Sequence, residues 1–231
     1  MALFTPPDAS AALCENVPFD TATDTPIDDK AEFDAFDQTS EGVNDPSRCK
    51  ALLAFPDGTI FWSSKMAIDG DGPAAGPGRL CGSELDPEDG QNDTSFHFCT
   101  GEGLSSEAVP FIVLPGGTFR TNTGLGLGDV ALVIYKDKIA AAICGDIGPS
   151  RKIGEGSIRL HEALHPPAAD PCSERQPDGS CMRILNDSID EDVLFFAFPN
   201  SSFGEELTAA NLETLVNERA FALYNKFRGA T

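Results

Sequence analysis

Short apolar segments rich in β-branched and aromatic residues, each bounded by turn-forming residues, constrain the fold of this chain more than any other feature. Segments of this length and composition are typical of β-strands. The 22 glycines and 17 prolines exceed the usual share and indicate many turns. We therefore expect a β-rich architecture rather than a helical bundle. The predicted strands are 50–55, 59–65, 109–115, two strands around a Lys-Asp-Lys turn within 128–146, and 192–198.

The two ends of the chain differ from this pattern. Residues 1–45 contain eleven acidic residues and one base, and we expect them to form an irregular acidic arm that packs on the domain. The remaining residues, 46–231, are expected to form a single domain. Its last segment, from about 208 to 228, has apolar residues every three to four positions, which predicts an amphipathic helix with Thr208 as its N-cap.

The charge of the chain excludes several classes of partner. With 37 acidic and 16 basic residues, the formal net charge is −21. Nucleic-acid binding needs clustered cations, and anionic membranes would repel such a chain, so we expect neither partner. No apolar run is long enough to span a bilayer, and the first ten residues lack the basic and apolar regions of a signal peptide. The acidity either keeps the protein soluble or attracts a polycation.

The seven cysteines favour disulfides over a metal cluster, because they lie far apart and contain no C-x-x-C pair. Cys172 and Cys181 flank a polar, turn-rich loop and form the best candidate bridge. This pattern predicts an oxidising, extracellular setting. Cys14–Cys49 and Cys81–Cys99 are conceivable further pairs, while Cys144 lies in an apolar run and is expected to be a buried thiol.

Two motifs formally match metal or phosphate sites. The segment His161-Glu162-x-x-His165 fits the H-E-x-x-H pattern of zinc peptidases, but two prolines follow directly and would end the helix. The alternative is a short amphipathic helix with polar residues facing solvent. The glycine-rich segment 124–129 resembles a phosphate loop, yet a strand follows it instead of a helix, so a turn is the better interpretation.

The segment Ile68–Pro73 carries two aspartates, Asp69 and Asp71, in an Asp-Gly turn. An EF-hand-like loop would need an oxygen ligand at the position of Pro73, which argues against calcium. Two interpretations stay open. The side chains either cap backbone N–H groups of the turn or form a carboxylate pair that binds a substrate cation.

A second pair of carboxylates lies within 144–160. Asp146 ends an apolar strand, and Glu155 follows nine residues later, between two glycines and just before a predicted helix start at Ser157. Two carboxyl groups on opposite sides of one loop can face each other across a groove, which is the arrangement that an inverting glycosidase needs. In the alternative interpretation, Asp146 caps a turn and Glu155 lies favourably at a helix N-terminus.

The same region resembles the fungal-type chitosanases of glycoside hydrolase family 75. The resemblance covers roughly residues 50–200, including 61–73, 128–164 and 192–199. Its most specific part is the pattern G-D-x-G-P followed by K-I-G-E-x-S, in which the family's two essential carboxylates fall on Asp146 and Glu155. Members of this family cleave β-1,4-linked glucosamine polymers internally, with inversion at the anomeric carbon.

The resemblance implies an enzyme with chitosan as substrate, with Glu155 as general acid and Asp146 as general base; the reverse assignment also stays open. Asp69 and Asp71 are candidates to bind glucosamine ammonium groups, Asp129 is a weaker one, and Trp62 could stack on a sugar ring. We expect no cofactor and no metal, a monomer, and a β-rich α+β fold with a small barrel core of double-psi type and peripheral helices. A zinc peptidase or a non-catalytic module that binds carbohydrate or polycations would be the alternatives.

Overall fold

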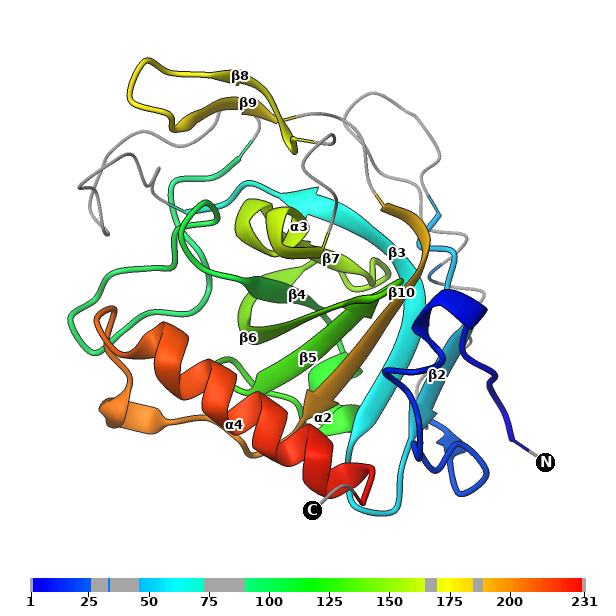
Figure 1. Cartoon of the computed structure of the whole chain (residues 1–231). Coiled ribbons are helices and arrows are strands. Elements are labelled where there is room, and N and C mark those ends of the chain that lie inside the picture. The colour runs from blue at the N-terminus through cyan, green and yellow to red at the C-terminus, as the bar shows by residue number, and fades with distance from the viewer. Residues whose placement is uncertain are drawn as a thin grey trace.

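A closed β-barrel forms the centre of the molecule. The computed structural model describes residues 2–25, 33, 46–72, 90–164, 170–184 and 189–229, and within them six strands close the barrel. The predicted α+β class with a small barrel core is confirmed, and the double-psi type stays a prediction. The strands follow one another as β3 (Ile60–Asp69), β10 (Ile189–Phe198), β5 (Val130–Tyr135), β6 (Lys138–Gly148), β4 (Phe111–Pro115) and β7 (Glu155–Ser157), and β7 pairs with β3 (Figure 1).

The predicted strands are confirmed, and two of the turns between them have the expected chemistry. β2 (Ala51–Ala54) and β3 are joined by a Pro-Asp-Gly turn, where Gly58 has a φ of +94° and donates its N–H to the Phe55 carbonyl at 2.9 Å. β5 and β6 form a second hairpin, in which Tyr135 pairs with Lys138. A short strand, β1 (Thr23–Asp24), extends the sheet beyond β2.

Two pairings in the barrel are parallel, β3 with β7 and β4 with β6, and the others are antiparallel. The β4–β6 pairing is interrupted, because Ile112 pairs with Cys144 whereas Val113 pairs with Asp146. Gly145 is therefore an extra residue in β6. Such a bulge bends a strand and changes the direction of the side chain beside it, which here is Asp146.

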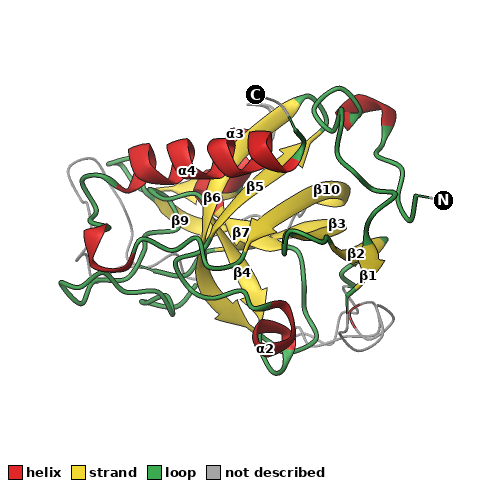
Figure 2. Ribbon diagram, turned by 90° about the horizontal axis from the view of Figure 1, so that it is seen from below, coloured by secondary structure: helices red, strands yellow, loops and turns green. Residues whose placement is uncertain are grey.

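The strands bury both of their faces, so two apolar layers flank the sheet. On β10, Leu194, Phe196 and Phe198 belong to one layer, and Phe195 and Ala197 belong to the other, as the two-residue period of a strand requires. The first layer includes the helix α4 (Leu212–Phe227), which packs on β5 and β6, as Figure 2 shows. The second layer contains Trp62 and residues of the helices α2 (Phe119–Thr123) and α3 (Ile158–Leu164).

The C-terminal helix is confirmed, but its start differs from the prediction. It begins at Leu212 with Asn211 before it, and Thr208 does not cap it. Instead, the Asn211 side-chain oxygen accepts the Thr208 N–H at 2.8 Å.

The N-terminal segment is attached to α4 by a hydrogen bond, because the buried Tyr224 hydroxyl donates to the Leu13 carbonyl at 2.8 Å. The predicted boundary between arm and domain at residue 45 stays a prediction. The chain also forms 3-10 helices at η1 (Asp8–Ser10) and η2 (Gly204–Glu206).

The segment that we expected to be a polar loop is a hairpin. β8 (Cys172–Arg175) pairs with β9 (Cys181–Ile184), and the predicted Cys172–Cys181 disulfide joins them. Cys144 is a buried thiol, as expected. The Cys14 thiol is free, so the conceivable Cys14–Cys49 bridge is absent, and Cys81 lies outside the described residues. Among the described residues, no helix is long and apolar enough to cross a membrane.

Candidate active site

A cavity of about 330 Å³ opens where β3, β6 and β7 approach one another. Four carboxylates line it: Asp69 at the end of β3, Asp71 just beyond, Asp146 on β6 and Glu155 at the start of β7. The two pairs that we identified separately in the sequence therefore belong to one site. The other lining residues are Ile68, Gly70, Gln91, Val113, Ile147, Gly148, Pro149 and Lys152.

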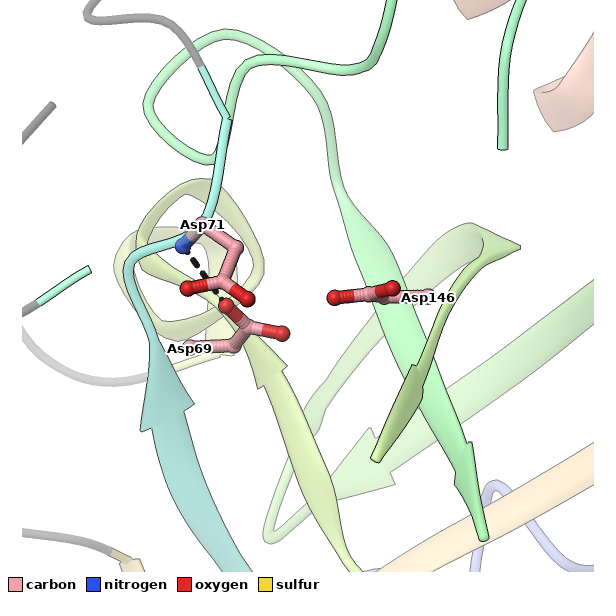
Figure 3. A group of neighbouring side chains, drawn as sticks. All are labelled: Asp69, Asp71 and Asp146. Atoms are coloured by element: carbon pink, nitrogen blue, oxygen red, sulfur yellow. Dashed lines mark hydrogen bonds between the residues drawn. The ribbon is translucent and has the colours of Figure 1, made fainter. Parts of the chain in front are cut away.

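The turn that carries Asp69 and Asp71 has the capping hydrogen bonds of the first interpretation made from the sequence. The Asp71 N–H donates to Oδ1 of Asp69 at 2.7 Å, and the Gln91 N–H donates to Oδ1 of Asp71 at 2.8 Å. These carboxylates therefore cap backbone donors. They also face Asp146 across the cavity, as Figure 3 shows.

Asp146 is 7% exposed and is held by one of its two oxygens. Oδ1 accepts the N–H of Ile147 at 2.7 Å, the N–H of Ser95 at 2.8 Å and the hydroxyl of Ser95. Three donors on one oxygen favour the ionised carboxylate. The structure thus fixes the orientation of the Asp146 carboxyl group at the wall of the cavity.

Glu155 is the first residue of strand β7, and the helix that we expected just after it is confirmed, with its start at Ile158 instead of Ser157. Glu155 pairs with Ala67 of β3. Its Oε1 forms an ion pair with the Lys152 ammonium at 2.7 Å, and its side chain is 13% exposed. Lys152 is thus a cation inside an otherwise acidic cavity.

The glycines on either side of Glu155 lie in close contact with neighbouring parts of the structure. Gly154 has a φ of +76°, and a Cβ there would lie 2.1 Å from the Lys65 carbonyl oxygen of β3. A Cβ on Gly156 would lie 2.9 Å from a methyl group of Leu160. Both glycines allow β7 to pack closely in the barrel, which fixes the position of Glu155.

Burial and then mutual repulsion raise the pKa values of the aspartate pair. Burial first, and then the negative charges of Glu155, Asp71 and Asp146, raise the pKa of Asp69 well above its ordinary value. Burial also raises the pKa of Asp71 to about 7, with further contributions from Asp146 and Glu155, although the Gln91 N–H opposes this shift. The cavity therefore retains protons on aspartates near neutral pH.

The cluster has the spacing of a cation site. One carboxylate oxygen from each of Asp69, Asp71 and Asp146 lies within 4.8 Å of the other two. An ammonium group or a metal ion could be accommodated by such oxygens. Because the carboxylates repel one another, a bound cation would stabilise their ionised forms.

Two residues that we expected to contact substrate lie elsewhere. Trp62 is fully buried and stacks on Phe195 with ring centroids 4.9 Å apart, so the structure does not bring it to a sugar. Asp129 is 3% exposed, and its carboxylate accepts backbone N–H groups from Gly126, Ser201 and Ser202 at 2.7–3.0 Å. It joins two loops outside the cavity. We therefore withdraw both residues as substrate contacts.

The H-E-x-x-H segment has the surroundings of a structural helix. His161 is buried, with Nε2 at 3.1 Å from the Ala67 carbonyl oxygen. Glu162 forms ion pairs with Arg175 at 3.0 Å and Arg159 at 3.2 Å. His165 lies outside the described residues. The two described members of the motif are thus engaged by the protein itself, which supports the amphipathic-helix interpretation.

The sequence did not point to three neighbours of the carboxylates. Lys152 belongs to the K-I-G-E pattern, so its proximity to Glu155 could have been inferred from their spacing of three residues. Ser95 lies 51 residues before Asp146 in a segment without a recognisable motif, and only the folded chain brings them together. Gln91 likewise reaches Asp71 from a distant loop.

The barrel brings carboxylates from separate strands into one cavity. Such an arrangement is typical of a glycoside hydrolase, which uses a pair of carboxyl groups. The family comparison is more specific. Residues 66–222 match the family described as fungal chitosanase of glycosyl hydrolase group 75, and the chain belongs to this family. No curated protein matches the chain significantly. The family assignment made from the sequence is therefore confirmed, and with it the class of glycoside hydrolase with chitosan as substrate.

Proposed function

We propose that this protein cleaves β-1,4 bonds within chitosan chains with inversion, using Asp146 and Glu155 as its catalytic pair. The observation that carries this proposal is that both carboxylates line one cavity of a family 75 chitosanase fold. In an inverting glycosidase, one carboxyl group protonates the leaving oxygen while the other activates a water on the opposite face of the sugar. No covalent sugar–enzyme intermediate is needed.

The hydrogen bonds support Asp146 as the general base. Its Oδ1 is held by three donors, which favour the ionised form that a base must have. Glu155 is then the general acid and must be protonated when the bond breaks. In the structure, the Lys152 ammonium lies 2.7 Å from Oε1 of Glu155.

Asp69 and Asp71 are proposed to bind an ammonium group of glucosamine. They line the cavity beside both proposed catalytic carboxylates, and burial together with the neighbouring negative charges raises their pKa values, which supports a role in binding a cation. A glucosamine ammonium would supply a positive charge, whereas the neutral acetamido group of chitin would not. This chemistry gives chitosan preference over chitin.

The test is the release of reducing ends from soluble chitosan by the wild-type protein and by Glu155→Gln and Asp146→Asn. We expect each variant to lose at least about 100-fold in kcat, the lower range for a positioned acid or base. Two exposed residues provide matched controls, Glu174→Gln on β8 and Asp137→Asn in the β5–β6 turn, and both should retain full turnover.

Product analysis separates the alternatives. An inverting enzyme releases the α-anomer from a β-linked chain, which nuclear magnetic resonance detects directly during the reaction. Turnover near the wild-type level in Glu155→Gln would refute the assignment of this residue. Binding of chitosan without any release of reducing ends would identify a non-catalytic module instead.

We also propose that the protein acts outside the cell as a monomer. The Cys172–Cys181 disulfide supports the location, because such bonds persist in oxidising environments. Light scattering of the purified protein tests the oligomeric state.

A further inference from the structure

We propose that Ser95 is a positioning residue for this reaction, which holds Oδ1 of Asp146 so that Oδ2 is the oxygen that takes the proton from water. The inference rests on the proposed role of Asp146 as general base. Ser95 contributes two of the three donors on Oδ1, its own N–H at 2.8 Å and its hydroxyl. Among the described residues, no backbone N–H or hydroxyl group donates to Oδ2. The charged and titratable groups that share the cavity with Asp146 are Asp69, Asp71, Glu155 and Lys152, and the carboxyl group of Asp71 is within hydrogen-bonding reach of Asp146.

The loop that carries Ser95 is anchored on both sides of this residue. The Phe96 N–H donates to the Gly145 carbonyl at 3.0 Å, directly beside Asp146. The Thr94 hydroxyl donates to the Phe96 carbonyl at 3.1 Å and accepts the Leu104 N–H at 2.8 Å. Ser95 is thus held at a fixed distance from β6 without any contribution from its own hydroxyl.

The hydroxyl of Ser95 is not needed for packing. Ser95 is exposed, whereas the neighbouring Thr94 is buried and links the loop to Leu104. Oδ1 of Asp146 already accepts two N–H groups, and the Ser95 hydroxyl is its third donor. Its removal should therefore affect the charge state and orientation of Asp146 more than the stability of the fold.

The variant Ser95→Ala removes this hydroxyl and keeps the N–H donor. We expect kcat to fall about tenfold with little change in KM, because one hydrogen bond to a charged group is lost. The acidic limb of the pH profile of kcat/KM should move about one unit to higher pH, since the ionised base is less favoured. Ser95→Thr retains a hydroxyl and should restore most of the activity and the original limb.

Ser202→Ala is the matched control. Ser202 is also exposed and also donates its N–H to an aspartate, Asp129 at 3.0 Å, but this aspartate lies outside the cavity. The pH profile of kcat/KM for Ser202→Ala should coincide with that of the wild type. In an Asp146→Asn background, Ser95→Ala should cause no further loss, because the two residues act as one unit.

The outcomes distinguish this inference from the proposed function. If the wild-type protein does not cleave chitosan, the proposed function fails. If it does, and Asp146→Asn is inactive, an unmoved acidic limb in Ser95→Ala overturns the role of Ser95, whether or not kcat falls. A shift of the alkaline limb instead would make Asp146 the acid and would also overturn the inference.

Discussion

A single residue of the site, Asp71, is expected to lower the free energy of unfolding once it is ionised. Its pKa is raised to about 7, mainly by burial, so the folded protein binds a proton more tightly than the unfolded chain. Between about pH 4, the ordinary range of an aspartate, and pH 7, the folded state holds more protons than the unfolded state. The contribution of the protonated Asp71 to the free energy of unfolding is therefore fully present below about pH 4 and is lost as the pH rises through 7.

Asp71→Asn should consequently stabilise the protein at pH 7.5 but not at pH 4. The asparagine oxygen can still accept the Gln91 N–H, so the turn is kept. Calorimetric melting temperatures of the variant and the wild type at both pH values measure the effect. Asp137→Asn, on an exposed turn, serves as the control without a pH-dependent difference. An equal change in Tm at both pH values would contradict the predicted protonation of Asp71.

At this scale, the sequence predicted which carboxylates meet but not how they are held. Asp146 and Glu155 could be selected because their spacing and the turn between them suggest a shared groove. The sequence could not show the extra residue Gly145 in β6 or the donors from Ser95, because both depend on the pairing of distant segments. Trp62 was misplaced because a lone tryptophan fits a core as well as a sugar site.

The disulfide-linked hairpin is an element whose effect reaches the site. Its apolar residues pack with Ile68 and Ile158. The terminal methyl group of Ile184 lies so close to Gly70 that a Cβ on this residue would be only 2.1 Å from it. Gly70 separates Asp69 from Asp71. The hairpin therefore covers the acidic turn from outside the cavity.

Replacing both cysteines, Cys172→Ser with Cys181→Ser, should lower the free energy of unfolding by about 2–3 kcal/mol, as expected for a loop of this length. The KM for chitosan should rise as well, because the support of the Asp69–Asp71 turn is weakened. Denaturant titration and initial rates measure the two effects. Cys99→Ser, which removes an exposed free thiol, is the control that should change neither. An unchanged KM in the double variant would show that the hairpin does not support the turn.

The elements themselves could be predicted where the pattern is strong. The short apolar runs rich in β-branched and aromatic residues predicted β3, β5, β6 and β10, and the 3–4 spacing of apolar residues predicted α4. β7 was missed because Glu-Gly-Ser has little intrinsic strand preference and is extended only through its pairing with β3 and β4. β8 and β9 were missed because their exposed, polar residues resemble a loop.

The charge of the whole molecule agrees with a cationic polymer as substrate. Residues 111–165 carry five acids and six bases, whereas the rest of the chain has a net charge of −22. The acidity thus lies mainly outside the segment that holds Asp146 and Glu155. Such a distribution attracts a polycation over distances comparable to the Debye length.

Raising sodium chloride from 0.05 to 0.5 M should therefore increase the KM for chitosan several-fold, with a smaller effect on kcat. Initial rates at a fixed pH measure this dependence. The control is the affinity of inactive Glu155→Gln for an uncharged, fully acetylated oligomer, which should not respond to salt. If the KM for chitosan were independent of salt, the acidity would serve solubility alone.

The strand that closes the barrel is also its shortest. β7 pairs with β3 through only three residues, and Glu155 is the first of them. Local opening exposes the weakest pairing first, long before the extended β3–β10 pairing separates. We therefore expect heating to abolish activity while most of the barrel is still folded. The temperature limit of activity would then be set by the β3–β7 pairing and not by the melting of the whole domain.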